Sequence, residues 1–461
     1  MTRWDLGALA RAAGSTTRGG ALPESVEAVG TDSRSLPPAS LFVALRGERF
    51  DGHEFCAAAA TAGAHVVMVD EAGDARLAAL PVPRLVVRDT LAALGDMARS
   101  ARRALAKPAV AVTGSNGKTT TKEMVAAILG ERGPVHKTTG NLNNLIGLPL
   151  TVFAWPESAW AAVLEMGMSV PGEIARLCDI GAPDVGIITM VGPAHLQGLG
   201  SIEAVARAKG ELYAGLAAGA TAVVNADDPV IGAVAVPLLG KKPRLSFGRA
   251  KGADVQVLAV ESRALGLTLA LSIAGARVEV ELPLVGPHNA QNAAAAAAAA
   301  HALGMSTDEI ARGLAKVRVP GGRLRVVRET CRQVAVIDDT YNANPASMRA
   351  AFEALRSVAT GRRVAVLGDM LELGPDSPRL HREVGAAAAI LGIGTLFAVG
   401  EQAEQVAAGA HERGAEARAF ATMDALLGAL PSALHGGDWV LGKGSRGMKM
   451  ERVVELLTES T

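Results

Sequence analysis

Short apolar runs rich in β-branched residues alternate along this chain with longer, alanine-rich stretches, and glycine and proline separate them. Examples of the apolar runs are residues 64–69 (AHVVMV), 109–112 (AVAV), 185–188 (VGII) and 364–367 (VAVL). Each run has the length of a buried strand and precedes a turn or a helical stretch. Buried strands that alternate with helices are typical of parallel sheets, so the pattern predicts an α/β fold.

Two interruptions in this pattern divide the chain. Residues 90–107 form a predicted helix that Pro108 ends, and this helix leads directly into the strand at 109–112. Near residue 320, a proline and two glycines follow a helical stretch and precede new strand-like segments. A chain of 461 residues is also long enough for about three domains. The predicted domains are 1–88, 89–320 and 321–461.

Composition and charge exclude several classes of protein. Hydrophobic residues make up 49% and charged residues 20% of the chain, which excludes wholesale disorder. Forty-six basic residues balance forty-six acidic ones, so there is no general positive field for nucleic acid. We therefore expect no nucleic-acid partner, and any anionic ligand must be bound locally.

Cysteine spacing and apolar runs indicate the compartment. Cys56, Cys178 and Cys331 lie far apart, so neither a disulfide framework nor a zinc site is expected. The first residues include Asp5 and contain no apolar core of a secretory signal. The eight alanines at 293–300 are too few to span a membrane. These features predict a cytoplasmic protein with no membrane span.

Residues 109–129 have the order of a phosphate-binding loop: a strand, then a glycine-containing loop, then a helix from 122 to 129. Backbone N–H groups at the helix start would bind phosphate oxygens, Lys118 would reach the β- and γ-phosphates, and the Thr119 hydroxyl would bind Mg²⁺. A glycine-rich turn with an incidental lysine is the alternative, and the complete order argues against it. The expected nucleotide-binding residues are Gly114, Ser115, Asn116, Gly117, Lys118, Thr119 and Thr120.

Three further polar residues follow in the same predicted domain. Glu165 ends an apolar run and would lie at the carboxyl edge of the sheet, where its carboxylate could hold Mg²⁺. His195 follows another strand and would emerge at the same edge, although a lone histidine is more often structural. Lys209 lies in a helical stretch (ARAKGE), where a lysine is ordinarily solvated.

Together these stretches resemble the Mur ligases, a family of ATP-dependent enzymes that form amide bonds in peptidoglycan synthesis. The segments at 113–120 (TGSNGKTT) and 164–167 (LEMG) resemble its ATP loop and its magnesium-binding glutamate, and His195 matches its metal-associated histidine. The segment around Lys209 resembles the one whose lysine is carbamylated in the family. A carbamate, unlike an ammonium, offers oxygen ligands to Mg²⁺.

The resemblance runs nearly end to end and implies a specific architecture. It implies a smaller α/β N-terminal domain for a UDP-sugar, a central P-loop ATPase-like parallel sheet and a Rossmann-like C-terminal domain. The stretches 338–348 (DDTYNANPASM) and 367–374 (LGDMLELG) are similar to the branch of the family that adds D-alanyl-D-alanine to UDP-N-acetylmuramoyl-tripeptide. These two molecules are therefore the expected substrates, and a monomer is expected.

The resemblance also assigns binding residues outside the phosphate loop. Asn289 and Asn292 would contact adenine, with helix capping as the alternative. Arg323 and Asp339 would reach the nucleotide across the domain boundary. A loop after a predicted strand at 438–441 would contact substrate, with a basic surface turn as the alternative. Leu145 departs from the family pattern, which favours an acidic residue there. The expected substrate contacts are Ser33, Arg34, Gly47, Asp51, His53, Asn141, Asn144, Tyr341, Asn344, Lys443 and Arg446.

The expected mechanism follows from the poor reactivity of a carboxylate. ATP would convert it to an acyl phosphate, with Lys118, Arg323 and Mg²⁺ neutralising phosphate charge. A second Mg²⁺ at His195 and carbamylated Lys209 would hold the carboxylate, and the amine of the dipeptide would then expel phosphate. No residue is identified as the base for that amine. Domains that close about hinges near 88 and 320 would exclude water.

Three other functions are considered. A sibling ligase that adds a diamino acid, or a folate polyglutamylating ligase, shares the core chemistry, but the YNANP stretch argues against both. A nucleotide-dependent switch or scaffold would not need the second metal site.

Overall fold

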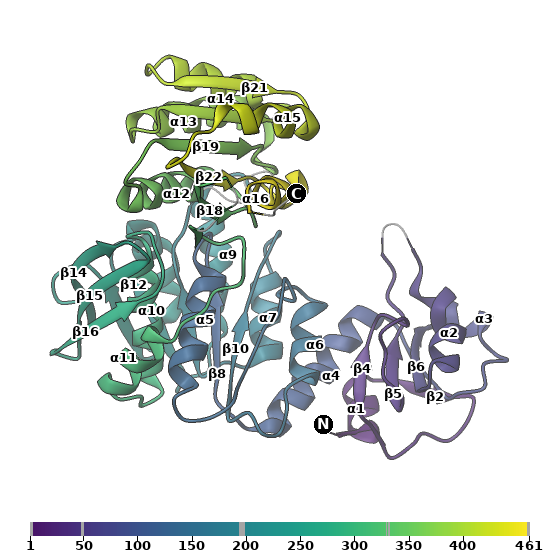
Figure 1. Ribbon diagram of the computed structural model, residues 1–461. Helices are drawn as coiled ribbons and strands as arrows, with labels where there is room; N and C mark the ends of the chain where they lie inside the picture. Colours follow the sequence, from purple (N-terminus) through teal and green to yellow (C-terminus); the bar gives the residue numbers. More distant parts are fainter. Residues whose placement is uncertain (1–2, 48–49, 193–198, 329, 331, 459–461) are drawn as a thin grey trace.

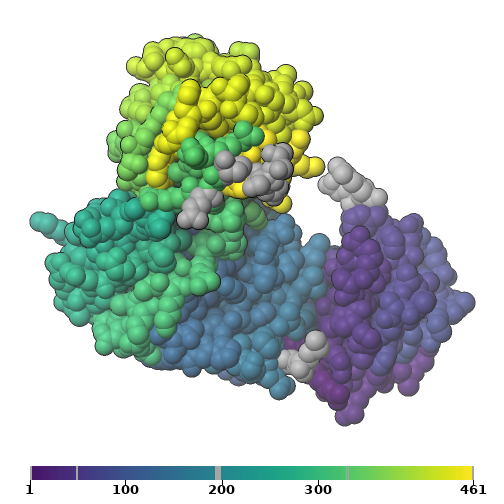
Figure 2. Space-filling model, in the orientation of Figure 1, coloured from purple at the N-terminus to yellow at the C-terminus, as the bar shows by residue number. Residues whose placement is uncertain are grey.

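The computed structural model describes residues 3–47, 50–192, 199–328, 330 and 332–458. Figure 1 shows three bodies: an N-terminal one, a central one and a C-terminal one above the central one. Each is built around its own sheet. The α/β prediction is confirmed, because each main sheet is largely parallel and carries helices. In Figure 2 an open recess separates the N-terminal body from the C-terminal body above the central one.

The N-terminal body holds a five-stranded sheet whose strands β4 to β7 are parallel, with β2 antiparallel at one edge. In spatial order its strands are β2 (Thr16–Arg18), β7 (Arg84–Val87), β6 (Ala64–Asp70), β5 (Ser40–Val43) and β4 (Ala28–Gly30). A separate two-stranded sheet pairs β1 (Trp4–Asp5) with β3 (Ser25–Val26). The helices are α1 (Leu6–Ala12), η1 (Gly52–Phe55), α2 (Cys56–Thr61) and α3 (Glu71–Arg76).

The central body holds a nine-stranded sheet, parallel from β9 to β14 and antiparallel over β14, β15 and β16. In spatial order its strands are β16 (Ala276–Leu282), β15 (Gly266–Ile273), β14 (Val255–Arg263), β13 (Arg244–Gly248), β12 (Thr221–Asn225), β11 (Val185–Ile188), β8 (Ala109–Thr113), β10 (Ala161–Glu165) and β9 (Val135–Lys137). The helices are α4 (Thr90–Leu105), α5 (Lys118–Leu129), α6 (Gly147–Phe153), α7 (Glu173–Gly181), α9 (Ile202–Gly215), η2 (Ile231–Ala235), η3 (Val236–Leu239), α10 (Asn289–Ala302) and α11 (Thr307–Ala315).

The alanine run forms most of α10, and all eight of its side chains are fully buried. Methyl side chains let this helix lie close to both α5 and the strands β12 to β15, which it contacts. The alanine run therefore packs in the central core. This agrees with the expectation that it is too short to span a membrane. No helix in the described ranges is both long and apolar enough to cross a membrane.

The C-terminal body holds a six-stranded sheet that is parallel except for β17 at one edge. In spatial order its strands are β17 (Arg325–Val327), β18 (Ala335–Asp339), β22 (Trp439–Lys443), β19 (Arg363–Gly368), β20 (Thr395–Val399) and β21 (Glu416–Phe420). The helices are α12 (Pro345–Val358), η4 (Gly374–Asp376), α13 (Ser377–Ile390), α14 (Ala403–His411), α15 (Met423–Ala433), η5 (Arg446–Met448) and α16 (Glu451–Thr458).

Three element boundaries differ from the sequence expectations. Helix α5 begins at Lys118, not at 122, because left-handed Gly117 (φ +81°) turns the chain directly into the helix. Helix α4 ends at Leu105, where a left-handed Ala106 stops it ahead of Pro108. Strand β22 extends to Lys443, so this lysine belongs to the strand and not to the following loop. Cys56 and Cys178 are free and buried, and Cys331 lies outside the described residues.

Candidate active site

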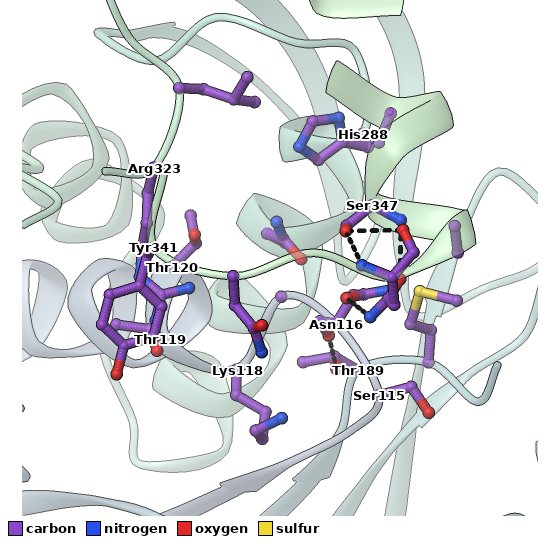
Figure 3. A pocket seen from close by; sticks show the side chains of 18 of the residues that line it. Ser115, Asn116, Lys118, Thr119, Thr120, Thr189, His288, Arg323, Tyr341 and Ser347 are labelled. Carbon is purple, nitrogen blue, oxygen red and sulfur yellow. Dashed lines mark hydrogen bonds between the residues drawn. The ribbon is translucent and has the colours of Figure 1, made fainter. Parts of the chain in front are cut away.

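A cavity of about 700 Å³ lies between the central and C-terminal bodies. Its walls come from the phosphate loop, the start of α10, the end of β18 and the start of α12, which Figure 3 shows from close by. The carboxyl ends of parallel strands in both sheets meet here, which is where open α/β sheets bind ligands.

The two glycines of the phosphate loop have no room for a side chain. A Cβ on Gly114 (φ +149°) would lie 1.9 Å from Thr189 Oγ1, and one on Gly117 would lie 2.5 Å from Asn292 Oδ1. Thr189 Oγ1 donates to the Asn116 carbonyl at 2.5 Å, and Ser115 Oγ donates to the Gly192 carbonyl at 3.0 Å. The Ser115 N–H also donates to the Met190 carbonyl at 2.9 Å, so the loop is held tightly from outside. The N–H groups that follow it, from Asn116 to the start of α5, are the ones that could bind a phosphate.

Lys118 begins α5 and lines the same cavity as Arg323. Its side chain is half-buried, and Nζ donates to the Gly114 carbonyl at 2.8 Å, across the loop that would receive a phosphate. Burial lowers the pKa of Lys118; Glu165 opposes this effect, and the charge of Arg323 adds to it. Two cations thus face one region of the cavity, an arrangement that a polyphosphate would neutralise.

Glu165 ends β10 and is buried beside Thr119. Thr119 Oγ1 donates to Glu165 Oε2 at 2.8 Å, and Asn143 Nδ2 donates to Oε1 at 2.8 Å. Lys122 Nζ lies 3.7 Å from Glu165 Oε2 and donates to the Thr138 carbonyl at 2.6 Å. These contacts hold the buried Glu165 carboxylate in one orientation, with the Thr119 hydroxyl oxygen next to it.

This pair of oxygen donors fits Mg²⁺, which is usually bound by one or two carboxylates together with substrate phosphates. In the described ranges no group of three or more His, Cys, Asp and Glu side chains is placed to hold a metal ion. His195, the predicted partner for a second ion, lies outside the described residues.

Lys209 projects from α9 into the cavity wall and is only 1% exposed. Burial lowers its pKa well below the usual value, and the charge of Lys118 lowers it further. No described residue pairs with or hydrogen-bonds its amine. The alternative of a solvated helix lysine is therefore wrong, because the surrounding fold withholds water from this side chain.

The start of α10 forms the next wall of the cavity. Asn289 Nδ2 donates to the Val285 carbonyl at 2.8 Å, and Asn292 Nδ2 donates to Asn289 Oδ1 at 2.8 Å. The helix begins without a side-chain cap, so the capping alternative does not describe these asparagines. The Asn292 amide instead lies against Gly117 of the phosphate loop, and Asn289 supports it from behind.

On the C-terminal side, Arg323 lies over the ring of Tyr341 with its guanidinium carbon 4.0 Å from the ring centroid. Lys443 Nζ donates to Asp339 Oδ2 at 2.5 Å and to the Asn342 carbonyl at 2.9 Å. Lys443 is buried, so it is not part of a basic surface turn, whereas Arg446 is exposed.

The phosphate loop also touches the C-terminal body directly. Asn344 Nδ2 donates to Asn116 Oδ1 at 2.8 Å, and Asn116 Nδ2 donates to Asn344 Oδ1 at 3.2 Å. The dashed bonds in Figure 3 run from Asn116 toward Ser347, at the start of α12. Residues 228 positions apart are thus paired side chain to side chain.

The predicted sugar-nucleotide residues of the N-terminal body do not line this cavity. His53 is buried, its Nδ1 lies 2.6 Å from Asp51 Oδ1, and its Nε2 accepts from the Asp70 N–H at 3.1 Å. Asp51 also binds Arg46 and Arg76, so it organises this body from within. The remaining members, Ser33, Arg34 and Gly47, lie in loops of the same body.

Only part of the loop at 139–146 lines the cavity. Asn144 lines the cavity and its Oδ1 accepts from the Gly147 N–H at the start of α6, while Asn141 is exposed and lies outside the wall. Asn143, which the sequence interpretation did not select, is the member that binds Glu165.

Sequence interpretation also missed His288. Its side chain lines the cavity, and its buried Nδ1 has no hydrogen-bond partner among the described residues. Burial lowers the pKa of His288 to about 4, Asp339 opposes the shift and Lys443 adds to it. The only available signal was its place directly before Asn289.

Comparison with known proteins agrees with this geometry. Three family models match successive parts of the chain: "Mur ligase family, catalytic domain" over 25–102, "Mur ligase middle domain" over 112–300 and "Mur ligase, glutamate ligase domain" over 322–446. Together they cover most of the sequence. The chain belongs to the Mur ligase family.

Two curated members of the Mur ligase family align with nearly the whole chain. The UDP-N-acetylmuramoyl-tripeptide--D-alanyl-D-alanine ligase of Bacillus subtilis is 39% identical over 443 residues, 94% of each chain. The ligase of the same name from Escherichia coli is 38% identical over 445 residues, 95% of this chain and 94% of that one.

Solved Mur ligase structures share the fold. A crystal structure of MurF from Acinetobacter baumannii has a TM-score of 0.91 at 34% identity and covers 98% of both chains. MurF ligase from Thermotoga maritima in complex with ADP has a TM-score of 0.80 at 29% identity, covering 93% of this chain and 96% of that one. A Mycobacterium tuberculosis folylpolyglutamate synthase with ADP has the same fold at 18% identity and a TM-score of 0.66.

Proposed function

We propose that this Mur ligase uses ATP to join D-alanyl-D-alanine to UDP-N-acetylmuramoyl-tripeptide through an acyl phosphate. One observation carries the proposal: a phosphate loop with its lysine and the YNANP stretch line a single cavity, and Asn344 of that stretch is hydrogen-bonded to the loop. The relatives named for this reaction support it, since they match over more than nine-tenths of the chain.

The first step is transfer of the γ-phosphoryl group to the tripeptide carboxylate. The loop from Gly114 to Thr120 binds the phosphates through its N–H groups, and Lys118 and Arg323 place positive charge where phosphate oxygens develop charge. Asn289, Asn292 and Asp339 bind the rest of the nucleotide. The ADP complex of the Thermotoga relative supports nucleotide binding in this fold.

Thr119 and Glu165 would hold Mg²⁺, which neutralises phosphate charge when bound. Asn143 and Lys122 keep the Glu165 carboxylate in place, by a hydrogen bond and by charge. His195 and Lys209 would hold a second ion, with Lys209 carbamylated. The burial of Lys209 and its lowered pKa support this modification, because only a neutral amine adds to CO₂.

The second step is attack by the amine of the dipeptide on the acyl phosphate, with phosphate as the leaving group. We assign the C-terminal body to the dipeptide, with Tyr341, Asn344, Lys443 and Arg446 as contacts. The cavity encloses the reacting groups between two bodies, which limits hydrolysis of the acyl phosphate. No described side chain is assigned as the base.

The sugar nucleotide enters from the N-terminal body. We propose domains at 1–88, 89–320 and 321–461, and a UDP-binding surface that includes Ser33, Arg34 and Gly47. Asp51 and His53 shape that surface from inside, because their polar atoms are already used within the body. Asn144, which lines the cavity, and Asn141 in the same loop would contact the sugar nucleotide beside the cavity.

A substrate panel tests the proposal. Purified protein is given ATP, Mg²⁺ and UDP-N-acetylmuramoyl-tripeptide with D-alanyl-D-alanine, D-alanine or L-lysine, and a parallel series offers UDP-N-acetylmuramoyl-dipeptide with a diamino acid. ADP and phosphate are expected only with the tripeptide and the D,D-dipeptide together. Turnover with the diamino acid and none with the dipeptide would show a sibling ligase. ATP hydrolysis at the same rate with and without the two cosubstrates would indicate a nucleotide switch.

A further inference from the structure

The reciprocal pair of Asn116 and Asn344 joins two segments that are each fixed independently. Asn344 caps α12: its Oδ1 accepts from the Ser347 N–H at 2.9 Å, and Ser347 Oγ accepts from the Asn344 N–H at 2.9 Å. With its oxygen committed to the cap, the Asn344 amide has one direction in which its N–H₂ can point. That direction is the phosphate loop, where Asn116 Oδ1 accepts at 2.8 Å.

Asn116 is equally constrained on the other side. Its carbonyl accepts from Thr189 Oγ1 at 2.5 Å, which anchors the loop backbone to the end of β11 and leaves the side chain facing the C-terminal body. The residues on either side of it are the loop glycine Gly117 and Ser115, which is bound to Gly192. Asn116 thus belongs to the backbone segment at the helix start that would bind a phosphate.

The two bodies also touch at places remote from the phosphate loop. Val285, which precedes α10, packs within the apolar core of the C-terminal body. Arg328 Nη2 donates to the Ala264 carbonyl in the turn between β14 and β15, at 3.2 Å. Neither contact involves the phosphate loop, whereas the asparagine pair joins that loop directly to the start of α12. We therefore expect this pair to determine how closely the start of α12 approaches the phosphates.

We propose that Asn116 and Asn344 are positioning residues that latch the C-terminal body onto the phosphate loop, so that phosphoryl transfer takes place only while the amine-binding body is closed. This inference rests on the proposed function for its catalytic consequence. The structural part of the inference, that the asparagine pair controls closure of the C-terminal body, does not depend on the proposed function. In this pair each side-chain amide donates one hydrogen bond to the other and accepts one from it. Neither serine nor aspartate, in place of one asparagine, reproduces both bonds.

The chain offers variants that separate the latch from the helix cap. Asn344→Ser keeps a capping hydroxyl but is too short to reach Asn116, and Asn116→Ala removes the latch without touching the cap. Ser347→Ala is the matched control, because it weakens the capping box and leaves both latch atoms in place. All three variants are compared with the wild type by thermal unfolding, to establish that they are folded.

The first measurement is the ratio of ADP formed to amide product formed at saturating substrates. We expect a ratio near one for the wild type and Ser347→Ala, and a rise of about threefold or more for both latch variants as acyl phosphate is lost to water. In the double variant Asn116→Ala/Asn344→Ser, the ratio of ADP to amide product should be no higher than in the more affected single variant. The reason is that both substitutions remove the same interaction. Unchanged ratios, or effects that multiply in the double variant, would overturn the latch.

The second measurement uses small-angle X-ray scattering with Mg²⁺ and a non-hydrolysable ATP analogue, and it needs no ligase activity. The wild type and Ser347→Ala should have a smaller radius of gyration than the two latch variants under the same conditions. Equal radii for all would refute the closure role even if the substrate panel succeeds. A wild type without ligase activity would refute the proposed function but leave this comparison intact.

Discussion

Thr119 donates a hydrogen bond of 2.8 Å to Glu165, which joins the first turn of α5 to the end of β10. The two residues are 46 positions apart, yet the parallel pairing of β8 with β10 brings the strand end to the phosphate loop. A hydroxyl and a carboxylate oxygen are thereby adjacent at the position where a metal–phosphate complex is expected. Loss of the carboxylate charge should therefore weaken the response to Mg²⁺ while the fold persists.

Glu165→Gln tests that relationship. The amide oxygen can still accept from Asn143, but the negative charge is gone, so we expect the Mg²⁺ concentration for half-maximal activity to rise tenfold or more. The stabilisation of the protein by Mg·ADP in thermal unfolding should shrink in parallel. Glu203→Gln, which removes the same charge from an exposed position on α9, is the control. An unchanged Mg²⁺ requirement would remove Glu165 from the metal site.

Lys118→Ala should abolish turnover, by about a thousandfold or more, because the phosphate charge loses its nearest cation. The side chain is half-buried at the cavity wall and not in the apolar core, so the melting temperature should change little. Binding of the sugar nucleotide, measured by calorimetry, should persist. Lys241→Ala, at an exposed lysine, is the control. Loss of folding in Lys118→Ala would show that the residue is structural.

Lys209→Ala should nearly abolish turnover if this lysine carries a carbamate. Acetate or formate should partly restore the activity by placing carboxylate oxygens in the vacated space, while Lys209→Arg should stay inactive, since guanidinium does not form a carbamate. Intact-protein or crystallographic detection of the carbamate gives a readout apart from activity. Near-normal activity of Lys209→Ala would contradict the assignment.

His288 should make folding stability depend on pH. Its pKa is about 4 in the folded chain against 6.5 ordinarily, so between these values the unfolded chain binds more protons. Stability should therefore rise with pH across this window, by on the order of 1–3 kcal/mol from this side chain. Above pH 6.5 both states are neutral and the contribution levels off.

His288→Gln isolates this effect, since glutamine is polar and does not titrate. The difference in unfolding free energy between the wild type and this variant, measured by urea titration, should change from pH 4 to 6.5 and be constant from 7 to 8. His301→Gln, at a histidine near the end of the same helix, is the matched control. A wild-type-minus-variant difference that is flat across the lower range would contradict the lowered pKa.

The sequence by itself determined those features whose causes are local in the chain. Short apolar runs between helical stretches predicted the parallel strands, and the spacing of glycines, Lys118 and Thr119 predicted the phosphate loop, because a loop of a few residues controls its own backbone. The antiparallel edge formed by β15 and β16 was not predicted, because the direction of a strand depends on the neighbour with which it pairs, and an apolar run does not specify that neighbour.

Tertiary structure decided the properties that depend on distant neighbours. Nothing in the stretch around Lys209 shows that the side chain is buried next to another lysine, because desolvation comes from surrounding elements and not from the helix itself. In the same way, the two ring nitrogens of His53 are used within its own body, and Asn116 meets Asn344 across 228 residues. Spacing along a chain defines local geometry, whereas burial, pKa and contacts between bodies arise only when the sheets pack together.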